Sequence, residues 1–275
     1  MPAPILLFLP AHDEADAVGD VVARVPAEVA GHPVHCLVID DGSSDATGAV
    51  AQAAGAEVLR FDQNRGLGAG VRAGLAAGAE RGAAAVAFCD ADGEYAPEEL
   101  ERLVAPILAG EADYVVGSRF AEGRPRLMHF HRMVGNRTLT AWVRHLTHLP
   151  VTDGQSGYRA FSPAAAAAAE VIHDFNYAQV LTLDLVAKGF RYAEVPISYR
   201  FRSTGESFVK LGPYLRKVIP AVRRELRSPS TVTAFGPPVD LSSPWADGEA
   251  EARTTAVEVD LTVAEVVRPA VTAID

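Results

Sequence analysis

The chain has 275 residues, of which 49% are hydrophobic and 22% charged, and this length allows a full core in one domain. The formal net charge of -10 argues against nucleic acid as a partner. No stretch reaches the roughly 20 apolar residues of a membrane-spanning helix, and the first residues lack the basic region of a signal peptide. Cys36 and Cys89 each end an apolar run, which favours buried free thiols. We therefore expect a cytoplasmic protein whose contact with a membrane, if any, is peripheral.

Strands alternate with helices along the first half of the chain. Apolar runs predict strands over residues 4–9, 33–39, 57–61, 83–88 and 114–117, and helical spacing predicts helices over residues 15–25, 46–54, 69–81 and 97–109. Ser44 or Asp45 is expected to cap the second helix, and Gly110 to end the fourth. This alternation predicts a mostly parallel sheet that is covered by helices on both faces.

The pattern changes after Arg119. We predict a loop over residues 124–131, helices over 133–146, from Pro163 and over 178–188, and a strand over 191–202. Residues 211–226 place apolar side chains on one helical face and basic ones on the other, which is typical of a membrane-surface helix or of an ordinary docked helix. The remainder is acidic and rich in small residues, which indicates a flexible tail. These changes predict a main domain over residues 1–209, a basic amphipathic helix over 210–227 and a tail over 228–275.

Two aspartates directly follow the apolar run over residues 83–88. Asp90 and Asp92 are two positions apart, so in an extended loop their side chains point the same way. Such oxygen ligands suit Mg²⁺ or Mn²⁺, which complete their shells with water and substrate phosphates. The same pattern alone also fits a solvated acidic turn.

Four loops are expected to meet at the carboxyl edge of the sheet, and they span residues 10–14, 40–45, 64–68 and 90–94. Because this edge is acidic, a phosphate ligand there requires a metal ion. Glu14 or Asp41 is a candidate to accept hydrogen bonds from a base or a ribose. Arginines that suit a second anion follow later in the chain: Arg119, Arg132, Arg159, Arg200 and Arg202. The combination indicates transfer between two phosphate-bearing substrates.

Several short stretches together resemble glycosyltransferase family 2, and within it the dolichyl-phosphate or polyprenyl-phosphate mannose and glucose synthases. The matching stretches are residues 10–14, 38–45, 64–68, 90–93, 117–119, Arg132 with Asn136 and Arg137, 153–159 and 205–207. The resemblance implies the GT-A fold, a Rossmann-like α/β fold that binds nucleotide sugars, with a mostly parallel central sheet flanked by helices. It covers residues 4 to about 210 in the order that the family shows.

The resemblance also implies roles for individual residues. The nucleoside positions are Pro10, His12, Glu14, Ile39 and Asp41. The metal positions are Asp90, Asp92 and Glu94, which with Ala91 also bind the donor diphosphate. Arg119 and Arg132 match acceptor-phosphate positions, and Arg202 and Lys210 match positions that close on the donor diphosphate. The implied catalytic residues are Asp92, Arg119, Arg132 and Asp153. In this sequence His12 stands where the family usually has tyrosine, and Glu94 stands where glutamine is common.

The reaction implied by the resemblance is an inverting, Mg²⁺- or Mn²⁺-dependent transfer of mannose or glucose. The donor is a nucleotide-diphosphate sugar such as GDP-mannose, and the acceptor is a polyprenyl or dolichyl phosphate at the inner face of the membrane, with a membrane partner subunit left open. One alternative is a soluble family 2 enzyme with a hydroxyl acceptor and Asp153 as base. Others are a nucleotidyltransferase, a non-catalytic nucleotide-binding protein and a Rossmann dehydrogenase, the last suggested only by the glycines of residues 66–70.

Overall fold

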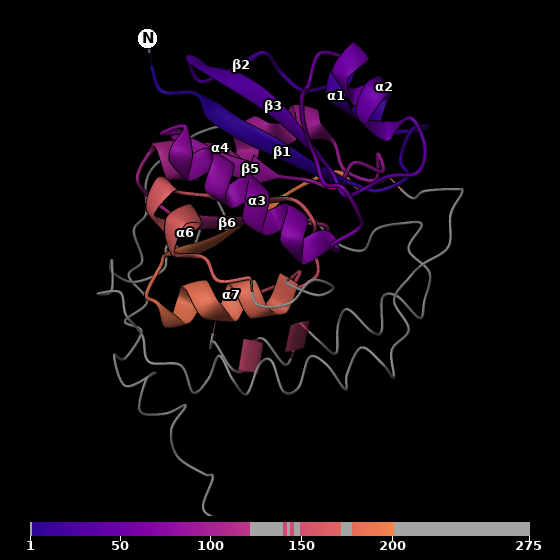
Figure 1. Cartoon of the computed structure of the whole chain (residues 1–275). Coiled ribbons are helices and arrows are strands. Elements are labelled where there is room, and N and C mark those ends of the chain that lie inside the picture. Colours follow the sequence, from indigo (N-terminus) through magenta and orange to yellow (C-terminus); the bar gives the residue numbers. More distant parts are fainter. Residues whose placement is uncertain (1, 122–139, 142–143, 146–148, 172–177, 201–275) are drawn as a thin grey trace, which may run out of the picture.

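The structure is a computed structural model that describes residues 2–121, 140–141, 144–145, 149–171 and 178–200 (Figure 1). The predicted loop over residues 124–131 and most of the predicted helix over 133–146 lie outside the described residues. The same holds for the predicted basic helix over 210–227 and the predicted tail over 228–275.

A mixed sheet forms the centre of the described structure. Its strands are β1 (Ile5–Ala11), β2 (Glu28–Val29), β3 (His32–Asp40), β4 (Glu57–Arg60), β5 (Ala85–Phe88), β6 (Tyr114–Ser118), β7 (Arg159–Phe161) and β8 (Tyr192–Pro196). The order is β3–β1–β5–β7–β6–β8, and β2 and β4 both pair with β3. Strands β4, β3, β1 and β5 run parallel to one another, and β6 runs parallel to β8. Strand β2 is antiparallel to β3, and β7 is antiparallel to both β5 and β6. The predicted mostly parallel sheet is therefore confirmed.

Helices cover both faces of this sheet (Figure 1). They are α1 (Val18–Ala23), α2 (Thr47–Ala53), α3 (Leu67–Glu80), α4 (Leu100–Leu108), α6 (Pro163–Ala168) and α7 (Ala178–Ala187), with a 3₁₀ turn at Pro97–Glu99. Alternate residues of β1 point to opposite faces. Leu7 packs in one core with residues of α1, α2 and α4, and Phe8 packs in the other core with residues of α3, α6 and α7. Burial on both faces explains why β1 is apolar throughout.

Glycines let α3 lie very close to the sheet. A Cβ atom on Gly74 would stand 2.3 Å from the ring of Phe8, and one on Gly78 would stand 2.3 Å from Val86. Both contacts are shorter than real side chains tolerate, so these positions require glycine for packing. The helix begins at Leu67, within the glycine-rich stretch over residues 66–70.

Three local predictions need correction. The strand predicted over residues 191–202 is shorter in the structure, where β8 ends at Pro196; beyond it Tyr199 forms only an isolated bridge with Tyr95, and residues 201–202 lie outside the described residues. Helix α2 begins at Thr47 with Ala46 as its N-cap residue, although the carboxylate of Asp45 still accepts the Thr47 N–H at 2.9 Å. Strand β7 was not predicted, because its three residues are too short to show a period.

The two cysteines are free thiols that differ in burial. Cys89 is buried, as expected, whereas Cys36 is partly exposed. Burial raises the pKa of the Cys36 thiol to about 12, with the nearby Glu57 carboxylate adding to the shift.

In the described part of the chain, no helix combines the length and apolar character that crossing a membrane requires.

Candidate active site

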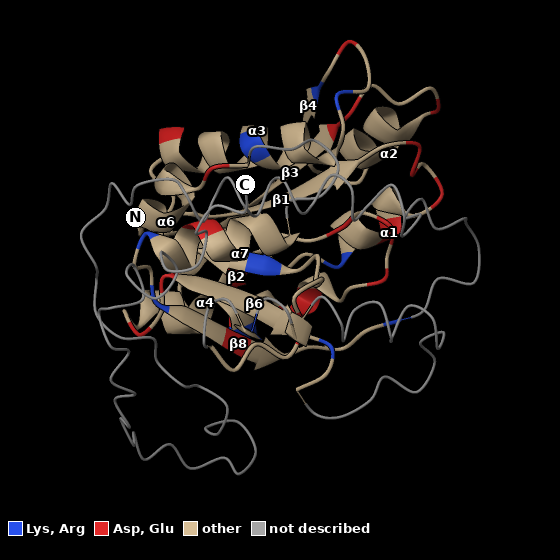
Figure 2. Cartoon of the chain, turned by 90° about the horizontal axis from the view of Figure 1, so that it is seen from below, with Lys and Arg blue, Asp and Glu red and all other residues tan. Residues whose placement is uncertain are grey.

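The site is assembled where the parallel strands end. Strands β1, β3, β5 and β6 share one direction, so the loops that follow them meet at one edge of the sheet. Residues 153–158 reach the same edge because the antiparallel β7 starts there. Figure 2 shows acidic positions along the loops beside α1 and α2. The structure thus brings together the loops that the sequence analysis expected to converge.

Asp41 holds the nucleoside end of the predicted site together. Its buried carboxylate accepts the backbone N–H of Arg65 at 2.6 Å and of Gly66 at 2.8 Å. The ring nitrogen Nδ1 of His12 lies 3.0 Å from the Asp41 carbonyl oxygen. Asp41 therefore ties the loop after β4 to the end of β3, and it places His12 beside both. The predicted role of these residues in binding a nucleoside stays a prediction.

The other predicted nucleoside residues lie around Asp41. Pro10 and Ile39 are register partners on β1 and β3, and both are buried. The backbone N–H of Glu14 donates to Thr47 Oγ1 at 2.8 Å. The neighbouring Asp40 has a structural role, since it is fully buried and pairs with Arg60 at 2.7 Å.

The acidic loop after β5 contains the predicted metal ligands. Asp92 Oδ1 accepts the backbone N–H of Glu94 at 3.0 Å, and Glu94 Oε2 accepts the Tyr199 hydroxyl at 2.6 Å. Burial raises the pKa of the Asp90 carboxyl well above its usual range, and the charges of Asp92 and Glu94 raise it further, while Arg119 opposes the shift. The three carboxylates are therefore close enough to interact electrostatically.

These donors do not form a closed cage. Among the described residues, no three histidine, cysteine or carboxylate side chains are clustered closely enough to hold a metal ion by themselves. Mg²⁺ is usually held by one or two carboxylates together with substrate phosphates and water. The oxygen donors of Asp90 and Asp92 fit that mode, in which the donor diphosphate completes the shell. Ala91 is buried between them.

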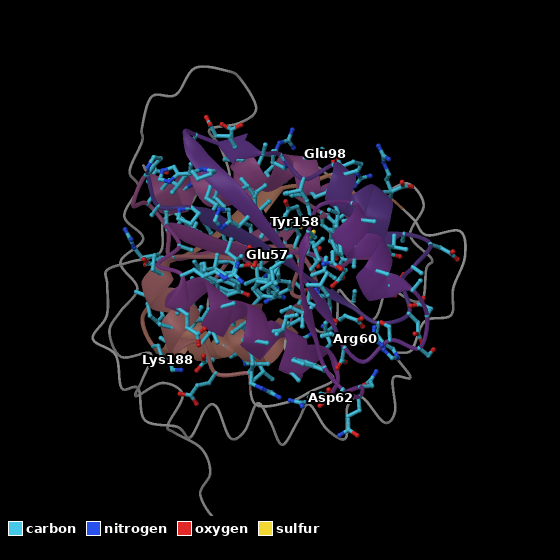
Figure 3. The ribbon with its side chains drawn as sticks, turned by 45° about the horizontal axis from the view of Figure 1, so that its top comes forward. Glu57, Arg60, Asp62, Glu98, Tyr158 and Lys188 are labelled. Carbon is cyan, nitrogen blue, oxygen red and sulfur yellow. The ribbon has the colours of Figure 1, made fainter. Side chains whose placement is uncertain are left out.

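Gly157 makes room for the Asp90 side chain. A Cβ atom on Gly157 would stand 2.2 Å from Asp90 Oδ2 and 2.8 Å from its Cγ. The backbone N–H of Gly157 donates to the Tyr95 hydroxyl at 2.8 Å. The next residue, Tyr158, is buried in the interior of the fold (Figure 3). The loop over residues 153–158 is thus packed against the acidic loop, a contact that sequence reasoning missed.

We expect Gly157→Ala to lower the rate of sugar transfer by about 10²-fold, because the new methyl group displaces the Asp90 carboxylate. The matched control is Gly154→Ala in the same loop, where the added Cβ comes no nearer than 3.3 Å to Thr140 Oγ1. Steady-state rates and melting temperatures of both variants make the comparison. Equal rates for the two variants would contradict the role assigned to Gly157.

Arg119 and Asp153 form a buried ion pair on the other side of the site. Arg119 Nε and Nη2 donate to the two carboxylate oxygens of Asp153 at 2.6 and 2.9 Å, and the Arg119 backbone N–H donates at 3.2 Å. The Asp153 side chain is fully buried and also accepts the Gln155 N–H at 3.1 Å. The side-chain hydrogen bonds from Arg119 to Asp153 use Nε and Nη2. The geometry favours Asp153 as the residue that orients Arg119, rather than as a base.

Glu194 holds the backbone beside the Arg119–Asp153 pair, a role that the sequence analysis did not predict. Its carboxylate accepts the backbone N–H groups of Thr152 at 2.9 Å and Asp153 at 3.2 Å, and the Tyr192 hydroxyl at 2.5 Å. It also accepts the Thr152 hydroxyl. Burial raises the pKa of Glu194 above its ordinary value, although these hydrogen bonds oppose the shift. A polar residue in the middle of a short strand reads as solvent-facing, so the sequence carried no signal for this role.

The raised pKa of Glu194 predicts a pH-dependent stability. An acid whose folded pKa is raised contributes stability below its unfolded pKa, near 4.5, and this contribution is lost as the pH rises through the folded pKa. Glu194→Gln removes that titration. We therefore expect the melting temperature of the wild type minus that of the variant to decrease as the pH rises above 4.5. Melting curves of both proteins over a pH series test this, and parallel curves would refute it.

Arg159 is removed from the arginines considered for anion binding. Its side chain is fully buried, and it donates to the carbonyl oxygens of Ser156 at 2.9 Å and Ala178 at 2.8 Å, as well as to the Tyr114 hydroxyl. These contacts tie the loop before β7 to α7. The predicted substrate-binding residues Arg132, Arg202 and Lys210 lie outside the described residues, so their roles remain predictions.

Comparison with known proteins agrees with this architecture. The family model described as Glycosyl transferase family 2 matches residues 7–161. A polyprenol monophosphomannose synthase of Mycolicibacterium smegmatis is 33% identical over 219 residues, which are 74% of this chain and 79% of the relative. An undecaprenyl-phosphate mannosyltransferase of Micrococcus luteus is 30% identical over 220 residues, which are 74% of this chain and 86% of the relative.

Solved structures share the fold. The glucosyl-3-phosphoglycerate synthase of Mycobacterium tuberculosis in complex with phosphoglyceric acid has a TM-score of 0.62 at 24% identity, covering 85% of this chain and 82% of that one. A further structure of that enzyme, 22% identical with a TM-score of 0.62 and the same coverage, holds Mn²⁺, uridine diphosphate and glucosyl-3-phosphoglycerate.

The fold and the edge on which its loops converge define a glycosyltransferase of the GT-A class. The family match extends from β1 to β7 and so includes the acidic loop, Arg119 and Asp153. The chain belongs to glycosyl transferase family 2.

Proposed function

We propose that this enzyme transfers a hexose, mannose or glucose, from a nucleotide-diphosphate sugar to a polyprenyl phosphate at the inner face of the membrane. The observation that carries the proposal is that an acidic loop and a buried arginine lie on the same edge of the sheet. The acidic loop with Asp90 and Asp92 follows β5, and Arg119, which pairs with Asp153, follows β6. A metal-bridged diphosphate suits the first site, and an anionic acceptor suits the second.

The names of the relatives support the class of acceptor. Two relatives are named as transferring mannose to polyprenol or undecaprenyl phosphate, and a third, from Methanococcus voltae, is named as a dolichyl-phosphate N-acetylglucosaminyltransferase. The basic amphipathic helix predicted over residues 210–227 would hold the candidate active site against the bilayer, where such lipids reside. We infer that residues 1–209 form the catalytic domain, which the basic amphipathic helix over 210–227 and the acidic tail over 228–275 follow.

Each residue has a definite task in the proposed reaction. Asp90 and Asp92 would hold Mg²⁺ or Mn²⁺, which when bound neutralises the leaving nucleoside diphosphate. Arg119 would position the acceptor phosphate through Nη1, since Asp153 holds its other two nitrogens. A phosphate oxygen is largely ionised near neutral pH, so the acceptor needs no strong general base. Attack on the face opposite the leaving group inverts the anomeric centre.

One radiolabel experiment tests the proposal. The purified protein is incubated with polyprenyl phosphate, Mg²⁺ or Mn²⁺ and, in parallel, labelled GDP-mannose, UDP-glucose and UDP-N-acetylglucosamine. We expect label from one hexose donor in the organic phase, and its loss when a chelator is added. Binding of a donor without any lipid-phase label would overturn the proposed acceptor and favour a soluble hydroxyl acceptor.

A further inference from the structure

Tyr199 touches both halves of the site. It lies beyond β8 and forms an isolated antiparallel bridge with Tyr95, which belongs to the segment after the acidic loop. Its hydroxyl donates to Glu94 Oε2 at 2.6 Å, and its ring centre lies 5.2 Å from the guanidinium carbon of Arg119. The backbone N–H of Arg200 donates to the Glu94 carbonyl oxygen at 2.8 Å. One side chain thus contacts the predicted metal loop with its hydroxyl and the predicted acceptor arginine with its ring.

The surroundings hold this side chain in place. The ring of Tyr199 packs edge-on against that of Tyr95, with the centroids 5.7 Å apart. Tyr95 is itself buried and accepts the Gly157 N–H at 2.8 Å. A phenol packed in this way loses little conformational freedom when it donates a hydrogen bond, so it can fix the rotamer of its acceptor. A cation over an aromatic face is stabilised by the ring quadrupole, and the effect grows as water is excluded.

We propose that Tyr199 is a positioning residue that couples the donor half of the site to the acceptor half. The inference rests on the proposed function, because it takes Glu94 as part of the metal and diphosphate loop and Arg119 as the acceptor ligand. The hydroxyl orients Glu94, and through it the loop that carries Asp92. The ring supports the guanidinium of Arg119 through its π face, while the Asp153 carboxylate accepts a hydrogen bond from the same guanidinium.

Two substitutions separate the effects of the hydroxyl and the ring. Tyr199→Phe removes the hydrogen bond to Glu94 and keeps an aromatic face beside Arg119. Tyr199→Leu removes both. Ser198→Ala is the matched control, because it deletes a hydroxyl that donates to another glutamate, Glu99 at 2.9 Å, from the adjacent position. Ser198 is exposed, and its partner lies outside the predicted site.

The first measurement is Mn²⁺ binding, followed by electron paramagnetic resonance with GDP or UDP present and without turnover. We expect Tyr199→Phe to weaken Mn²⁺ binding about tenfold relative to the wild type, as is typical when a residue that orients a ligand is lost. The second measurement is the KM for polyprenyl phosphate. We expect Tyr199→Leu to raise it at least about threefold above that of Tyr199→Phe, because the cation–π contact is lost.

The outcomes distinguish this inference from the proposed function. Failure of the wild type to use polyprenyl phosphate would overturn the proposed function, whereas the Mn²⁺ measurement would still decide the role of the hydroxyl. Wild-type Mn²⁺ binding by Tyr199→Phe, or no Mn²⁺ binding by the wild type, would overturn the inference. Equal acceptor KM values for the phenylalanine and leucine variants would also overturn it. If Tyr199→Leu fails to fold, the phenylalanine variant alone decides through its Mn²⁺ affinity.

Discussion

Replacing Asp92 by asparagine is expected to lower kcat for sugar transfer by about 10³-fold, because the loop loses one of the charges proposed to bind the metal ion. Asparagine keeps the size of the side chain, and its amide oxygen can still accept the Glu94 N–H that Asp92 Oδ1 accepts at 3.0 Å. The loop geometry is therefore retained while the charge is removed. Steady-state kinetics and Mn²⁺ binding measure the effect, and an unchanged melting temperature shows that the fold is intact.

Glu98→Gln is the control for this change. Glu98 follows the same loop, and its exposed carboxylate pairs with Arg24 at 3.4 Å (Figure 3). Removing that charge is expected to leave kcat unaltered, since exposed ion pairs contribute little. If Asp92→Asn retains near-normal turnover, the acidic loop is not the diphosphate site and the assignment of the donor half is wrong.

The second large effect is expected at Arg119. Replacement by alanine leaves Asp153 buried without its ion-pair partner, and this should cost about 3–5 kcal/mol in the free energy of unfolding. It should also lower kcat/KM for the acceptor by about 10²-fold or more, because the charged hydrogen-bond donor proposed to bind the acceptor phosphate is lost. The KM for the donor should change far less. Denaturant unfolding and steady-state kinetics with each substrate varied in turn give these quantities.

A double variant separates stability from catalysis at this pair. Arg119→Met combined with Asp153→Leu removes both buried charges and replaces them with apolar groups, which is often neutral or stabilising. We expect this variant to regain most of the lost stability and to remain unable to use the acceptor. Recovery of acceptor use together with stability would mean that Arg119 only supports the fold. Arg119→Lys adds a third comparison, since lysine keeps the charge but not the paired fork.

Much of the fold followed from the apolar pattern of the first half of the chain. Strands β1, β3, β4, β5 and β6 were each expected near their observed positions, because each is a short apolar run bounded by turn residues. The acidic loop was found for the same reason, since Asp90 and Asp92 directly follow such a run. Strand β7 escaped because it has three residues and depends on β5 and β6 on either side of it.

The parts of the site that were missed depend on long-range contacts. Glu194 contacts a turn some forty positions earlier, and Tyr199 contacts Glu94 across more than a hundred positions. No local pattern marks either residue, since a single glutamate within a strand or a single tyrosine beyond one is common. Arg159 shows the opposite error, because its guanidinium made it a candidate for anion binding while burial makes it structural. Residue type and loop position predicted the edge of the sheet on which the candidate site lies. Burial, which the sequence did not reveal, determined that Arg159 supports the fold.

The antiparallel strand β7 has a geometric consequence for the substrates. Since it lies between β5 and β6, the loops after these two strands start two interstrand spacings apart, or about 10 Å. A sheet in which β5 and β6 were direct neighbours would halve that separation. The inserted strand therefore sets the spacing between the start of the loop proposed to bind the diphosphate and the start of the loop proposed to bind the acceptor anion. Because backbone hydrogen bonds on both sides hold β7, this spacing is set by strand pairing and not by any one side chain.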